Sequence, residues 1–83
     1  MDKVLIEVYV PVLEKSYDFF VPLQSQMSEV LMLIKKGITE LTDGDYVSDE
    51  NVFLCHRDSG AIININKSVY ELGIKNGSRL MLI

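Results

Sequence analysis

The one adjacent pair of residues in this chain that could perform nucleophilic chemistry is Cys55 followed by His56. A catalytic dyad needs the thiol and the imidazole within hydrogen-bond reach of each other. Residues 52–56 have the composition of a strand, in which neighbouring side chains point to opposite faces. We therefore predict that no dyad forms and that Cys55 is a packed or partly exposed thiol. Because the chain has no second cysteine or histidine, a zinc site would need ligands from another protein.

A second candidate for chemistry is the acidic segment 42–51, in which three aspartates follow at even offsets: Asp43, Asp45 and Asp49. A calcium loop of the EF-hand type needs an oxygen ligand at its fifth position and a bidentate glutamate at its twelfth. Counted from the first aspartate, these positions are Val47 and Leu54, and the glycine is also misplaced. A phosphate-cradling glycine loop and a paired catalytic carboxylate motif are missing too. We expect no catalytic residue, no metal, no cofactor and no enzymatic activity.

Length and composition indicate a single globular domain over residues 1–83. An apolar share of 48% is enough for one core and argues against a disordered chain. The formal net charge of −4, with Lys35 and Lys36 as the only adjacent basic residues, argues against nucleic-acid binding. The lone cysteine fits a reducing compartment, and no apolar stretch has the length of a signal peptide or a membrane span. We expect a soluble cytoplasmic protein without direct membrane insertion.

The elements that must position these residues begin with two strands joined by a hairpin. Residues 4–10 alternate between two faces, and one face is β-branched throughout: Val4, Ile6, Val8 and Val10. Residues 11–16 form the connection, and residues 17–23 alternate again as a second strand. Pro22 has no N–H to donate to a ladder, so it should mark the end of that strand or an edge of the sheet.

The next element is a helix over residues 27–41, with Ser25 or Gln26 as its N-terminal cap. Its predicted core-facing stripe consists of Met27, Val30, Leu31, Ile34, Ile38 and Leu41. Gly37 lies inside this pattern at a cost of about 1 kcal/mol relative to alanine, which indicates close backbone packing or a loosened last turn. Two further apolar residues lie outside the stripe and either cover the edge of the sheet or are presented to a partner: Met32 and Leu33.

After the helix the chain returns to strands. The acidic segment 42–51 is the longest irregular stretch, and it leads into a third strand over residues 52–56. Residues 57–60 form a turn, and residues 61–65 form a fourth strand. Ser68 can then cap a single 3₁₀ turn.

The chain closes with a tight turn and one more strand. Asn76-Gly77 supplies a turn with positive φ at low steric cost, and residues 79–83 form the last strand. The resulting order, β-β-α-β-β-3₁₀-β, predicts an α+β roll in which a mixed sheet packs on one helix.

The candidate site is the face of the sheet that the helix leaves uncovered. Period-two alternation points Leu5 and Tyr9 outward from the first strand, Phe53 from the third and Met81 from the last. We predict that these residues form a contact surface for a protein partner or for a second copy of the chain. The apolar patch that they form is larger than scattered exposed leucines would explain. The alternative is that they only reflect loose packing by the long loop or self-association.

Three stretches of the chain resemble the ubiquitin-like β-grasp superfamily. They are Val-x-Ile-x-Val at residues 4–8, Tyr-Asp-Phe-Phe-Val-Pro-Leu at residues 17–23, and Leu-Gly-Ile-Lys-Asn-Gly-Ser-Arg-Leu at residues 72–80. Within that superfamily the chain looks most like the YukD/EsaB family of small bacterial proteins associated with type VII (WXG100) secretion. The resemblance implies a cytoplasmic, non-enzymatic accessory or regulatory protein that docks on the secretion machinery. It assigns no functional residues.

The same resemblance leaves two alternatives. Ubiquitin and the sulfur carriers have a flexible tail ending in Gly-Gly after the last strand, whereas this sequence closes on residues 79–83 without one. We therefore expect neither conjugation to other proteins nor sulfur transfer. The remaining alternative is a generic ubiquitin-like protein-interaction domain of another assembly.

Overall fold

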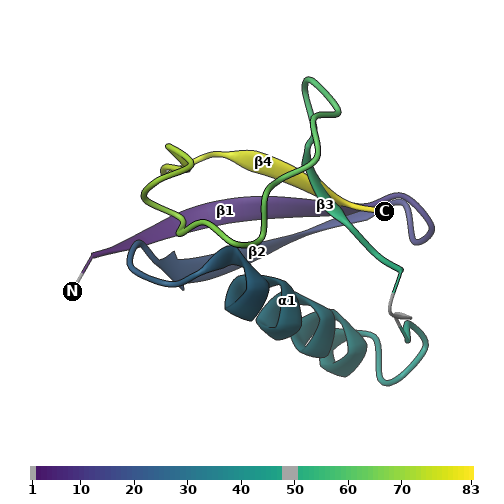
Figure 1. Ribbon diagram of the computed structural model, residues 1–83. Coiled ribbons are helices and arrows are strands. Elements are labelled where there is room, and N and C mark those ends of the chain that lie inside the picture. Colours follow the sequence, from purple (N-terminus) through teal and green to yellow (C-terminus); the bar gives the residue numbers. More distant parts are fainter. Residues whose placement is uncertain (1, 48–50) are drawn as a thin grey trace.

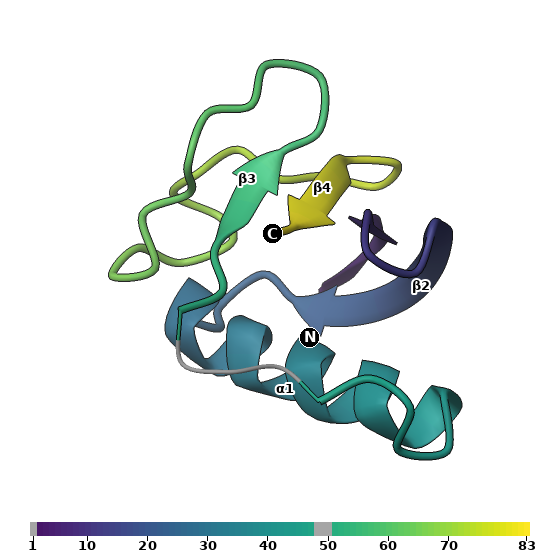
Figure 2. The ribbon, with the colours of Figure 1, turned by 90° about the vertical axis from the view of Figure 1, so that its right-hand side faces the viewer.

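The computed structural model describes residues 2–47 and 51–83 (Figure 1). Its elements, in chain order, are β1 (Lys3–Val10), β2 (Lys15–Pro22), α1 (Met27–Leu41), β3 (Leu54–His56) and β4 (Arg79–Leu82). The strands form one sheet in the order β2-β1-β4-β3, and α1 lies across one face of it (Figures 1 and 2). β1 is antiparallel to β2 and parallel to β4, and β3 is antiparallel to β4. The predicted mixed sheet on one helix is confirmed.

The core lies between α1 and the sheet, where the two apolar periodicities meet. The β-branched face of β1 is buried as predicted, and Val21 of β2 and Leu80 of β4 join it from the neighbouring strands. The helix contributes its buried stripe of Met27, Val30, Ile34 and Ile38. Pro22 ends β2, which is an edge strand, so its missing N–H interrupts no ladder.

The predicted helix bounds of residues 27–41 are confirmed, although the helix is not capped by a side chain. Gln26 occupies the cap position with extended backbone and makes no side-chain cap hydrogen bond. Instead the N–H groups of Met27 and Ser28 donate to the carbonyls of Lys67 and Ile65, each at 2.9 Å. Residues 65–67 thus satisfy the first donors of the helix and tie it to the second half of the chain.

The prediction is wrong for one residue of the core-facing helix stripe. Leu41 is 63% exposed, because it is the last residue of α1 and lines an open depression beside the β1–β2 hairpin rather than the closed core. Of the two explanations for Gly37, close packing is confirmed, since a Cβ at this position would lie 2.8 Å from Cε1 of Phe19. Leu31 is partly buried against the core, as predicted.

The second half of the chain has less regular structure than predicted. The third strand is confined to Leu54–His56, and in place of a fourth strand over residues 61–65 there is a single bridge between Ile62 and Cys55. The reason is geometric. β3 is only three residues long, and the chain must leave it at once for residues 65–67 to reach the start of α1.

The predicted cap by Ser68 is confirmed, although the residues after it form turns rather than a regular 3₁₀ helix. The N–H of Glu71 donates to Oγ of Ser68 rather than to the Ser68 carbonyl, and the Ser68 N–H donates to Oε1 of Glu71. This reciprocal pair has the hydrogen bonds of a capping box, although no α-helix follows it. Consecutive turns follow, and Val69 is fully buried beneath them.

The closing turn and strand are confirmed. Gly77 has φ 86°, and the Ser78 N–H donates to the Lys75 carbonyl at 3.0 Å. Oδ1 of Asn76 accepts a hydrogen bond of 2.7 Å from the N–H of Leu5, which fixes this turn against β1.

Residues 48–50, which include Asp49 of the rejected calcium loop, lie outside the described residues.

Candidate interaction surface

The side of the sheet opposite α1, called the outer sheet face below, carries the four predicted contact residues. Tyr9 of β1 lies opposite Met81 of β4, and Met81 lies opposite Cys55 of β3. Phe53 pairs with Ile83 through two backbone hydrogen bonds of 2.8 and 2.9 Å. The sheet register therefore brings Tyr9, Met81 and Phe53 to one end of this face.

Leu5 lies at the other end of the outer sheet face and does not join that group. Its direct neighbour across the β1–β2 pair is Phe20, which is 66% exposed. The four predicted residues also differ in accessibility, since Phe53 is 52% exposed whereas Leu5, Tyr9 and Met81 are only half-buried. The face thus carries two separate apolar areas rather than one.

A row of charged residues separates the two areas, and sequence analysis did not anticipate it. Glu7 lies opposite Arg79 in the sheet, and its carboxylate accepts a hydrogen bond of 3.1 Å from Arg57. Arg79 in turn donates to Asp58 at 2.8 Å. Both pairs are exposed at the surface, so each contributes less than about 1 kcal/mol to stability.

Arg57 also covers Tyr9, one of the four predicted contact residues. Its guanidinium carbon lies 4.2 Å from the centroid of the Tyr9 ring, in cation–π geometry. A partner that contacts Tyr9 must therefore meet or displace a cation. The signal was present in the sequence, because Glu7 and Arg79 both occupy outward positions, but the strand order that places them side by side cannot be read from alternation alone.

Cys55 belongs to the outer sheet face by register and yet is buried, with 1% of its surface exposed. Its Sγ donates to the Met81 carbonyl at 3.7 Å, and burial raises the pKa of the thiol above its ordinary value. His56 lies opposite Leu80 in the next register position, so its side chain belongs to the other face. The two residues form no dyad, and the protonated thiol is a poor nucleophile.

Three exposed apolar residues on this side of the sheet escaped the sequence analysis: Phe20, Ile62 and Ile83. Ile83 adjoins Phe53 as its backbone partner, and Ile62 bridges to Cys55, so both extend the apolar end of the face. On the helix, Met32 and Leu33 are 71% and 52% exposed. These two side chains do not cover the edge of the sheet.

Residues 2–47 and 51–83 contain no group of three or more histidine, cysteine, aspartate or glutamate side chains placed to hold a metal ion. Within the same ranges no helix has the length and apolar character needed to cross a membrane.

A mixed sheet of this order, wrapped on one face by a single helix, defines a ubiquitin-like β-grasp fold, and comparison with solved structures agrees. The ubiquitin-like domain of the Mycobacterium tuberculosis type VII secretion protein EccD1 superposes with a TM-score of 0.77 at 13% identity, covering 100% of this chain and 99% of that domain. Ubiquitin of Caldiarchaeum subterraneum gives a TM-score of 0.71 at 12% identity, covering 99% and 92% of the two chains.

A third similar structure is part of a larger assembly. A chain of the ESX-5 inner membrane complex gives a TM-score of 0.70 at 18% identity, and the match covers 100% of this chain but only 21% of that one. No protein-family model and no curated protein sequence matches this chain. At these identities the likeness establishes the ubiquitin-like fold.

Proposed function

We propose that this chain is a non-enzymatic, cytoplasmic ubiquitin-like accessory or regulatory protein of a bacterial type VII (WXG100) secretion system. The observation that carries the proposal is the end-to-end similarity to the EccD1 ubiquitin-like domain, with a TM-score of 0.77 over 100% of the chain. The chain of the ESX-5 inner membrane complex supports the same assignment, since it contains a similar domain. The sequence resemblance to the YukD/EsaB family points to the same system independently of the superposition.

The surface proposed to act is the outer sheet face at the end where Tyr9, Phe53 and Met81 lie together. An aromatic ring and a methionine beside an arginine are the residue types that supply most of the energy in protein interfaces. The charged row next to them can select a partner of complementary charge. This arrangement suits protein–protein contact and offers no group that could carry out a reaction.

A crosslinking experiment in the native host tests the proposal. A photoreactive phenylalanine analogue at Phe53 should crosslink to components of the secretion machinery, because this side chain is half exposed on the proposed surface. The same analogue at Tyr70, which is 72% exposed and lies outside the sheet, serves as the matched control and should give no such product. Crosslinks from both positions, or from neither, would count against this surface.

A secretion assay separates the proposal from its alternative. Deletion of the gene should lower export of WXG100 substrates, and the variant Tyr9→Ser with Met81→Ser should fail to restore it. The alternative is a ubiquitin-like interaction domain of another assembly, and the similarity to an archaeal ubiquitin is compatible with it. Unchanged export after deletion, together with crosslinks to unrelated proteins, would favour that alternative.

A further inference from the structure

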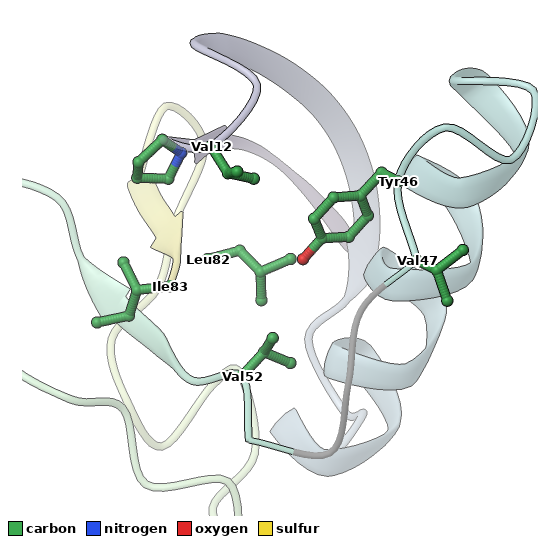
Figure 3. Close-up of a pocket in the computed structure, with 7 residues that line it drawn as sticks. Val12, Tyr46, Val47, Val52, Leu82 and Ile83 are labelled. Carbon is green, nitrogen blue, oxygen red and sulfur yellow. The ribbon is translucent and has the colours of Figure 1, made fainter.

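An open apolar cavity lies at one end of the sheet, next to the β1–β2 hairpin and the segment that follows α1. It is lined by Pro11 and by the residues labelled in Figure 3: Val12, Tyr46, Val47, Val52, Leu82 and Ile83. Its volume is about 340 Å³, and among the described lining residues the Tyr46 hydroxyl is the one polar side-chain group. Val12 and Val47 are each 77% exposed, so the cavity opens to solvent.

Hydrogen bonds from backbone N–H groups hold two walls of this cavity. In the hairpin, the N–H groups of Leu13 and Glu14 donate to the carbonyls of Val10 and Pro11 at 3.0 and 3.1 Å. On the opposite wall, the Tyr46 N–H donates to the hydroxyl of Thr42 at 3.1 Å. These bonds hold the hairpin wall and the Tyr46 wall in place, which lowers the conformational entropy lost on binding.

Val12 and Val47 do not contribute to the core, because most of their surface is in water. Exposed large apolar side chains at the mouth of an apolar cavity are the usual signature of a docking site. The described lining favours an apolar ligand over a small polar one, since it offers a single hydroxyl to orient the latter. The walls suit an aliphatic or aromatic side chain presented by another polypeptide.

The charge beside the cavity is negative. Four acidic side chains on the flanking segments are exposed, and none is in an ion pair within the described residues: Glu14, Glu40, Asp43 and Asp45. Lys15 is the only cation on these segments, and the sequence from Gly37 to Cys55 contains no lysine or arginine. The electrostatic field at this end favours a basic partner.

We propose that this cavity binds an apolar side chain carried by a basic amphipathic segment of another protein. A second copy of the chain is a poor occupant, because a symmetric contact at this end would bring two acidic rims together. The cavity adjoins the outer sheet face at Ile83 but is centred on other residues, and the inference does not depend on the secretion assignment. It adds a second docking point and specifies the charge of what docks there.

The test uses a synthetic helical peptide with a leucine stripe and lysine on its flanks, and a counterpart in which every lysine is glutamate. With the ¹⁵N-labelled protein, the lysine peptide should shift the amide signals of Val12, Tyr46 and Val47 in NMR spectra. The glutamate peptide should leave them unchanged. Replacing both exposed valines, Val12→Lys and Val47→Lys, should weaken binding of the lysine peptide by about tenfold or more.

The matched control is Met32→Lys, which makes the same change at a side chain that is 71% exposed on α1. It should alter the affinity by less than about twofold, since surface charges act weakly beyond about 8 Å at physiological salt. Equal losses in the control and the test variant would overturn the proposal. So would binding of the glutamate peptide, shifts centred on Tyr9 and Met81, or no binding of the lysine peptide.

Discussion

At the scale of single residues, the contact between Gly37 and Phe19 sets the distance between α1 and β2. A Cβ on Gly37 would lie 2.8 Å from the Phe19 ring, which is the far end of a side chain that can shift. Glycine costs a helix about 1 kcal/mol relative to alanine, so the fold accepts this cost for a close approach. We predict that Gly37→Ala alone brings little or no stabilisation, whereas in a Phe19→Leu background it stabilises by about 1 kcal/mol.

Urea unfolding of the four proteins in this double-mutant cycle measures the coupling. Gly37→Val adds two further carbon atoms toward the same ring and should be destabilising by about 1–3 kcal/mol. If Gly37→Ala gave the same gain with either residue at position 19, the ring would not be what excludes a side chain here.

A second residue-scale prediction concerns the Ser68–Glu71 box. The backbone hydrogen bond from Ser68, followed by its hydroxyl, holds the pKa of the Glu71 carboxyl below its ordinary value of 4.5. The folded state therefore favours the ionised form. The stabilisation is complete above pH 4.5 and is lost as the pH falls through the lower, folded-state pKa.

We expect the wild type to lose more stability between pH 7 and pH 3 than Glu71→Gln does, since the amide cannot titrate. Urea midpoints at the two pH values give the comparison. Glu40→Gln, at an exposed glutamate, is the matched control for the removal of one negative charge. An identical acid response in Glu71→Gln would contradict the capping role.

At the scale of elements, the orientation of α1 is set by which of its side chains are buried against the sheet. Val30 is 2% exposed and faces the sheet, so Val30→Asp should destabilise by several kcal/mol through burial of an unpaired charge. Met32 is two residues away and 71% exposed, and Met32→Asp should change the free energy of unfolding by less than about 0.5 kcal/mol. Thermal unfolding followed by circular dichroism distinguishes the two. A Val30→Asp protein that melts near the wild type would disprove this placement of the helix.

The elements also show how far the sequence predicts this fold. The long periodic segments, β1 and α1, have the faces expected of them, because their periodicity reports burial directly. Residues 61–65 have strand composition but form one bridge, since the chain turns away from β3 and the Ile65 carbonyl accepts from the Ser28 N–H at the start of α1. That arrangement depends on a contact between distant parts of the chain. The placement of Arg57 over Tyr9 and the cavity beside Val12 were missed for the same reason.

At the scale of the whole molecule, the two halves of the chain are joined at several places, which include the middle of the sheet and the start of α1. β1, from the first half, pairs with β4, the last strand, in the middle of the sheet. Residues 65–67 supply carbonyls to the first turn of α1. The outer sheet face and the cavity lie on this shared framework, so substitutions at their exposed residues should leave folding intact. The framework also determines how the molecule unfolds.

We predict that the chain unfolds in one cooperative transition, as expected for a single small domain. Leu80 of β4 is fully buried, so Leu80→Ala should cost about 2–5 kcal/mol and lower the melting temperature by about 8 °C or more. The thermal midpoint of the helical circular dichroism signal should fall together with the midpoints of the NMR signals from β2 and β4. The reason is that loosening the central β4 also loosens residues 65–67, which hold the start of α1. If α1 and β2 kept their wild-type midpoint while β4 melted early, the two halves would be separate units and the single-domain assignment would fail.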